Sequence, residues 1–326
     1  MATPASKALS IIIKIINSLL NNAILIIILT LLMFAGYALW DSSQLYQAAD
    51  KNNYEVYKPA IADEGKSFQE LQAINPEVIA WLTVYGTNID YPINQGTDNM
   101  KYVNTNAEGE YSMSGAIFLD YQNKSDFSDF NSILYGHHME KKAMFGDIGS
   151  FEDKDMFDSH MYGNLYVNGR DCGIEFFSYV QTDAYDSFFF TAAVRDEDRA
   201  PFLNNVILKS MHKRDIGVTI SDRIILLTTC SINSTNGRDI LVGRIMDETF
   251  IDPFIFEETD DGSVILRADA RTDFLSNIPK AFWIQAGLIL LALLLAIPII
   301  NMNRRNVRET RAAKEALMKE FNKAGY

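Results

Sequence analysis

The chain has 326 residues, of which 48% are hydrophobic, and its formal net charge is −13. The length fits one large domain or two ordinary ones, and the apolar content excludes an intrinsically disordered chain. The acidic balance argues against nucleic-acid binding, which needs a basic surface.

The first predicted element is an apolar helix near the N-terminus. Residues 23–40 form a run of 18 residues without a charged side chain, which is long enough to cross a bilayer. A cleavable signal peptide is the alternative, but its apolar part is usually about 7 to 15 residues long. No small-x-small cleavage site follows this run. The sequence therefore favours a retained transmembrane anchor, preceded by a cytoplasmic tail over residues 1–22.

Residues 41–280 are predicted to form an acidic external domain. A helix at 67–74 leads into Asn75-Pro76, and short β-rich runs punctuated by Gly, Asn, Asp and Ser follow it. These runs lie at 78–84, 88–94, 115–121, 132–137, 164–169, 174–182, 216–220, 224–230 and 239–245. A helix over 199–213, with Pro201 in its first turn, interrupts the series. The pattern predicts a mostly antiparallel β-barrel or sandwich with a few helices.

A second apolar segment follows the external domain. Residues 281–300 are 20 residues without a charge, and the part from 287 onward has no polar face, so a membrane span is favoured over a buried helix. The tail at 301–326 carries a net charge of +4, and the N-terminal tail carries Lys7 and Lys14 without an acid. Because short basic flanks stay in the cytoplasm, both termini are predicted to be cytoplasmic.

The chain has two cysteines, and their positions differ in kind. Cys230 ends an aliphatic and β-branched run, so it should stand at the mouth of a strand, where a reactive thiol can meet a ligand. A buried, inert cysteine is the commoner fate of a free thiol, and Cys172 at the start of a strand fits that description better. A single disulfide between the two stays possible from the sequence.

Two further strand-end residues could act with Cys230. His137 ends a strand beside Gly136, and a Cys/His pair needs no adjacency in sequence. A structural role is the alternative, and periodicity does not choose between His137 and His138. Arg238 opens the strand after the cysteine loop, and a hairpin would bring it to the rim that carries Cys230. There a guanidinium could stabilise an oxyanion, although composition alone favours a solvent-facing strand-edge charge.

The sequence contains no CxxC or HExxH spacing, and it predicts neither a metal site nor a cofactor.

These residues lie in motifs that resemble the sortase family, class B. The segment 226–230 followed by Arg238 resembles the sortase TLxTC signature with its downstream arginine, and 131–139 resembles the histidine strand, which identifies the catalytic histidine as His137. The resemblance runs from about residue 70 to 247. Its other motifs are 74–82, 89–95, 115–121, 144–148 and the helix at 199–213.

Three features depart from the class B pattern. Leu226 replaces the first threonine of the signature, and Ile232 stands where some class B enzymes have an acid. The second apolar segment with its basic tail resembles the layout of class C enzymes, which build pili.

The resemblance implies an eight-stranded β-barrel with N-terminal and peripheral helices, flanked by two transmembrane helices. It implies a cysteine transpeptidase on the surface of a Gram-positive cell, in which the Cys230 thiolate attacks a peptide carbonyl. His137 would protonate the leaving amine, and Arg238 would hold the substrate and stabilise the oxyanion. Thr229 would contribute substrate contacts, with a packing role as the alternative. The partners would be secreted proteins or pilins with a sorting signal, and a peptidoglycan precursor or pilin lysine as the amine acceptor.

Other functions fit the sequence less well. A pilus-specific polymerase in place of a wall-anchoring enzyme is the nearest alternative. A papain-like peptidase would need a local signature that is missing around Cys230. A surface adhesin or sensor with a structural cysteine is the non-enzymatic alternative.

Overall fold

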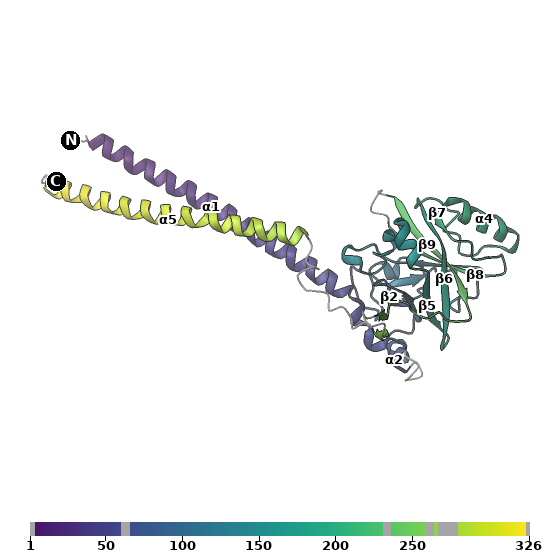
Figure 1. The fold of residues 1–326 in the computed structure, drawn as a ribbon. Helices are drawn as coiled ribbons and strands as arrows, with labels where there is room; N and C mark the ends of the chain where they lie inside the picture. The colour runs from purple at the N-terminus through teal and green to yellow at the C-terminus, as the bar shows by residue number, and fades with distance from the viewer. Residues whose placement is uncertain (1–3, 60–65, 231–235, 259–263, 267–279, 324–326) are drawn as a thin grey trace. The chain divides into compact units, whose positions relative to one another are not determined.

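The computed structural model describes residues 4–59, 66–230, 236–258, 264–266 and 280–323 (Figure 1). The chain divides into two compact units. One unit is Gln44–Arg271, and the other combines Met1–Ser43 with Thr272–Tyr326.

The unit Gln44–Arg271 is built on a closed β-barrel, as predicted. Eight strands follow one another in the order β5-β1-β2-β3-β4-β8-β9-β6, and a further pairing of β5 with β6 closes the ring. Adjacent strands are antiparallel except for β2 with β3 and β4 with β8. The strands are β1 (Val78–Val84), β2 (Asp90–Asn94), β3 (Ile117–Leu119), β4 (Asn131–Tyr135), β5 (Tyr162–Val167), β6 (Arg170–Asp183), β8 (Arg223–Cys230) and β9 (Gly237–Met246).

Strand β8 is buried on both faces. Ile225 and Leu227 belong to one large apolar cluster with residues of β1, β2 and β6, whereas Ile224 and Leu226 belong to a second cluster. Helix α4 (Arg199–Lys209) contributes Phe202 and other side chains to the second cluster, and it lies beside β7 and β8 in Figure 1. Burial on both faces accounts for the unbroken apolar run that leads to Cys230.

Near α4 the structure differs from the prediction in two places. The helix predicted over 199–213 ends at Lys209, and Ser210–Lys213 form strand β7, which pairs with β6 through Ser178, Tyr179 and Val180. Because β5 covers only the first half of that edge of β6, the remaining backbone groups are open to a further strand. The run 216–220 forms no strand, and instead Ile216 and Val218 pack partly against the second cluster.

The remaining elements of this unit are short. The predicted helix at 67–74 is confirmed as α2 (Lys66–Ile74), which buries Phe68 and Leu71. The other elements are α3 (Lys154–Ser159), the hairpin β10 (Phe256–Glu258) and β11 (Val264–Leu266), and the 3₁₀ turns η1 (Lys51–Asn53), η2 (Glu55–Tyr57), η4 (Lys101–Val103), η5 (Glu140–Lys142), η6 (Ile148–Glu152) and η7 (Asp196–Asp198).

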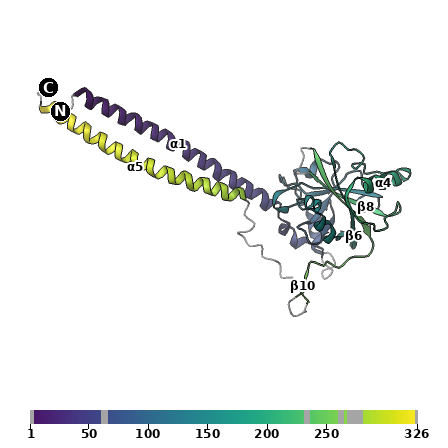
Figure 2. The same cartoon turned by 45° about the horizontal axis from the view of Figure 1, so that its top comes forward.

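The described part of the second unit consists of α5 (Lys280–Lys323) and of the long helix α1 (Pro4–Ala48) as far as Ser43, and these helices lie side by side in Figures 1 and 2. The end of α1, from Gln44 on, belongs to the first unit. Lys14 Nζ lies 2.8 Å from Glu309, and Ser18 Oγ lies 2.9 Å from Asn303 Oδ1. Asn303 also donates to Asn22. Among the described residues, one helix is long and apolar enough to cross a membrane, the part Leu9–Ala48 of α1. The predicted second span, 281–300, lies inside α5, and its insertion in a membrane stays a prediction.

Candidate active site

Cys230 and Arg238 are direct neighbours across the β8/β9 hairpin. They are the last aligned pair of the two strands, so the predicted meeting of these residues at one rim is confirmed. Cys230 is a free, exposed thiol, and the residues from Ile224 to Thr229 that precede it in β8 are buried. Cys172 is also free and is fully buried in β6. Ile232, in the loop that joins the two strands, lies outside the described residues.

The register of β4 against β8 distinguishes His137 from His138. Tyr135 pairs with Thr228 in a parallel ladder, and the N–H of Gly136 donates to the carbonyl of Thr228 at 3.2 Å. Paired residues face the same side of a sheet, and side chains alternate along a strand. By this alternation, His137 lies on the face that carries Cys230, and His138 lies on the opposite face.

The ring of His137 is held by the main chain. Its Nε2 lies 2.8 Å from the carbonyl oxygen of Val103, the last residue of η4. A carbonyl can only accept, so Nε2 must carry the proton in this contact. In the neutral ring, Nδ1 is then the nitrogen that can take up a proton from a neighbour.

The Val103 carbonyl can lie in its observed position because residue 115 is a glycine. Gly115 has φ +60, and a Cβ at this position would lie 2.5 Å from the Tyr102 oxygen and 2.7 Å from the Val103 oxygen. The N–H of Ala116 donates to the Tyr102 carbonyl at 3.0 Å, which holds the two segments together. A side chain at 115 would displace the backbone that orients His137.

Thr229 and Asp239 are paired residues on the other face of the hairpin. Asp239 is buried and accepts hydrogen bonds from Tyr179 Oη and Gln181 Nε2, each at 3.1 Å. Thr229 is buried, and its hydroxyl has no hydrogen-bond partner among the described residues. The structure therefore gives Thr229 a packed environment, and its predicted substrate contact stays a prediction.

Arg238 is half-buried, and its guanidinium has hydrogen-bond donors available for a ligand. Its Nη1 donates to the carbonyl of Gly237 at 2.9 Å. Within the described ranges no carboxylate forms an ion pair with it, whereas Arg223 and Arg244 on the same two strands pair with Asp247 and Glu175. A guanidinium without a carboxylate partner keeps hydrogen-bond donors available for a ligand.

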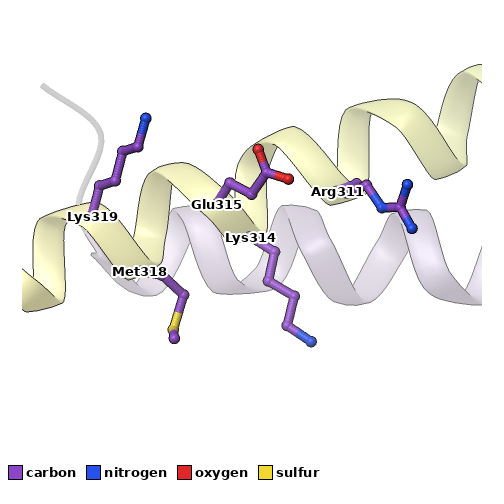
Figure 3. A pocket seen from close by; sticks show the side chains of 5 residues that line it. All are labelled: Arg311, Lys314, Glu315, Met318 and Lys319. Carbon is purple, nitrogen blue, oxygen red and sulfur yellow. The ribbon is translucent and has the colours of Figure 1, made fainter.

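A shallow pocket lies on α5 and contains none of the predicted site residues. Its lining is Arg311, Lys314, Glu315, Met318 and Lys319 (Figure 3). Figure 3 shows Lys314 and Met318 pointing to one side of the helix and Glu315 and Lys319 to the other, so these side chains do not converge on a ligand. In the described part of the chain, no group of three His, Cys, Asp or Glu side chains could hold a metal ion.

Known proteins resemble more than half of the chain. No family model matches it. Sortase B of Staphylococcus aureus is 31% identical over 184 residues, which cover 55% of this chain and 74% of that protein. A cysteine-to-serine mutant of Clostridium perfringens sortase B is 35% identical with a TM-score of 0.57, over 61% of this chain and 97% of that one. The chain belongs to the class B sortases.

A second solved sortase is closer still in sequence. The class B sortase of Streptococcus pyogenes involved in pilus biogenesis is 42% identical, with a TM-score of 0.52, over 56% of this chain and 99% of that one. Membership of the family supports a transpeptidase and disfavours the adhesin hypothesis.

Sequence reasoning missed the partner of the His137 ring. The partner is a backbone carbonyl, which every residue type carries, so the sequence contains no signal that singles out Val103. The one hint is Gly115, because a left-handed glycine marks a close backbone approach.

Proposed function

We propose that this sortase cleaves a sorting-signal peptide through a thioacyl intermediate on Cys230 and passes the acyl group to an amine. The pairing of Cys230 with Arg238 at one exposed rim is the observation that carries the proposal. The Cys230 sulfur attacks a peptide carbonyl carbon, and the C–N bond of that peptide breaks. An acceptor amine then attacks the thioester, which forms the new amide and releases the thiolate.

His137 is the proposed acid and base of both steps. Its Nδ1, freed by the contact of Nε2 with Val103, takes the proton of the Cys230 thiol, gives it to the leaving amine, and later takes one from the incoming amine. A main-chain partner keeps the ring in one orientation through this cycle, because the Val103 carbonyl does not titrate.

Arg238 is the proposed oxyanion and substrate ligand. Arg238 is the residue paired with Cys230 across β8 and β9, and its side chain lacks a carboxylate partner among the described residues. A planar guanidinium can bind the carbonyl oxygen before attack and the oxyanion after it.

The chemistry is tested by intact mass after incubation of the full chain, in detergent, with a library of sorting-type pentapeptides. We expect an acyl adduct that is absent from Cys230→Ala and retained in Cys172→Ala, because Cys172 is buried. An adduct that persists in Cys230→Ala would refute the assignment of the nucleophile.

Polymerisation of pilins is the second candidate function. The observation that favours it is the 42% identity to a sortase involved in pilus biogenesis, against 31% to Staphylococcus aureus sortase B. The two functions differ in the acceptor, which is a lysine of a pilin or an amine of the peptidoglycan cross-bridge. Competition between a lysine peptide and a cross-bridge peptide for the preformed thioacyl enzyme separates them.

The proposed topology has two spans, at 23–40 and 281–300, with both termini in the cytoplasm and residues 41–280 outside. The contact of Asn303 with Asn22 supports it, because Asn22 precedes the first predicted span and Asn303 follows the second. The cytoplasmic ends of two antiparallel spans would then lie level. Polar side chains at such a boundary favour association of the helices.

A further inference from the structure

The loop that follows His137 has an unusual backbone. We call residues 137–146 the histidine loop. Lys141, Lys142 and Met144 have φ angles of 60°, 61° and 51°, a left-handed region that is unfavourable for residues with a Cβ. Three such residues within four positions persist only where the surroundings hold them.

Contacts inside the loop link these residues to His137. The N–H of Phe145 donates to the carbonyl of His137 at 3.0 Å, and His138 forms a β-bridge with Met144. Gly146 closes the loop tightly, because a Cβ there would lie 2.2 Å from the Met139 oxygen. A displacement of residues 144–146 would therefore move His137.

The hydroxyl of Tyr91 holds this returning segment. Tyr91, in β2, is 2% exposed. Its oxygen accepts the N–H of Met144 at 3.1 Å and donates to the carbonyl of Ala49 at 2.9 Å. One buried hydroxyl thus connects the strained residue Met144 to a second segment of the same unit.

That second segment is the end of α1. Ala49 follows directly on the last residue of the helix and is 1% exposed. The last turn of α1 also reaches the loop, because Tyr46 Oη donates to Glu140 at 3.2 Å and Lys141 Nζ lies 4.6 Å from the centre of the Tyr46 ring. The end of the anchor helix and the histidine loop therefore share one buried and two exposed contacts.

We propose that Tyr91 is a positioning residue for the transpeptidation reaction. Its hydroxyl fixes the histidine loop against the end of α1 and so holds His137 on the face that carries Cys230 and Arg238. The proposal rests on the proposed role of His137 as acid and base.

Tyr91→Phe tests the proposal because it removes one oxygen atom and keeps the ring. In the full chain in detergent, we expect the rate of thioacylation to fall about tenfold, the size of one lost hydrogen bond, while KM changes less than about twofold. The pH profile of thioacylation should shift as well, since His137 loses its fixed place. Tyr46→Phe should give a smaller decrease in rate, because its contact is exposed.

Tyr85→Phe is the matched control. Its hydroxyl is largely buried and donates to the carbonyl of Phe250 at 3.1 Å, a residue outside the histidine loop. We expect this variant to keep the wild-type rate and pH profile. Equal losses in Tyr91→Phe and Tyr85→Phe would show a general effect on stability and would overturn the proposal.

Hydrogen exchange supplies a readout that does not depend on activity. Backbone amides of residues 137–146 should exchange faster in Tyr91→Phe than in the wild type, with no such change in Tyr85→Phe. Unchanged exchange in Tyr91→Phe overturns the proposal whether or not the enzyme forms an adduct. Faster exchange in Tyr91→Phe with an unchanged rate of thioacylation would show that Tyr91 holds the loop but that the loop does not govern His137. This outcome would also overturn the proposal. Failure of the chemistry itself would appear separately, as absence of a Cys230 adduct in the wild type.

Discussion

The Nε2 atom of His137 and the carbonyl oxygen of Val103 lie 2.8 Å apart. The ring is thus oriented by the main chain, and within the described residues no carboxylate or amide side chain contacts it. No side-chain truncation removes this partner directly. On the Val103 side the contact is broken by moving the backbone of residues 102 and 103, and this makes Gly115 an informative position to change.

Gly115→Ala should decrease thioacylation by at least about tenfold, because its methyl group would displace the Val103 carbonyl from His137. It should also cost stability, about 1–2 kcal/mol from the positive φ alone and more from the close backbone oxygens. Gly169→Ala is the control for the strain, because Gly169 has φ +76 and nothing within 4 Å of a Cβ. We expect Gly169→Ala to lose only the stability that the strain costs and to keep its activity, measured by thermal unfolding and peptide kinetics. Loss of activity in both variants would attribute the effect to stability.

Arg238→Lys should decrease kcat/KM for thioacylation by about 100-fold while the protein folds normally, because a point charge does not reproduce a planar fork of donors. Arg223→Lys, on the neighbouring strand, changes an arginine whose surface partner is Asp247. That variant should keep wild-type kinetics. Unchanged turnover in Arg238→Lys would remove the guanidinium from the mechanism.

Glu77 should make the segment that carries Val103 sensitive to acid. Burial alone would raise the pKa of Glu77, but hydrogen bonds from Lys101 and Tyr102 outweigh it and hold the pKa below the ordinary 4.5. Because the folded-state pKa is the lower one, this stabilisation is complete above about pH 4.5 and is lost as the pH falls through the folded-state value. The difference in melting temperature between wild type and Glu77→Gln should therefore shrink as the pH is lowered from about 7 to 3. A constant difference over this range would contradict the assignment.

Ser18→Cys combined with Asn303→Cys should form a disulfide when isolated membranes are treated with an added thiol oxidant, because the two side chains meet at 2.9 Å. Leu20→Cys with Asn303→Cys is the control, since Leu20 is 56% exposed and lies on another side of α1. Cross-linking is read as a mobility shift on gels after cleavage of the chain between the helices. Equal yields for the two pairs would show that α1 and α5 do not associate through this face.

Much of the barrel could be predicted because its strands carry their own pattern. The apolar run to Cys230 and the restart at Arg238 predicted the hairpin, which the pairing of these two residues confirms. Strand β7 was missed because Ser210–Lys213 continue the helical pattern of the residues before them. They form a strand because they pair with the open edge of β6, and this pairing is a tertiary feature. Periodicity did not choose between His137 and His138, and the family motif selected His137; the register of β4 against β8 gives an independent physical reason, which no local pattern contains.

The burial of Cys172 has a consequence for oxidative damage to the enzyme. A sulfenic acid formed on Cys230 is normally rescued by a nearby thiol that closes a disulfide. The chain has only one other cysteine, and it is fully buried in β6. An oxidised Cys230 would therefore await a reductant from outside the protein, and the folded enzyme would offer electrophilic inhibitors a single reactive sulfur.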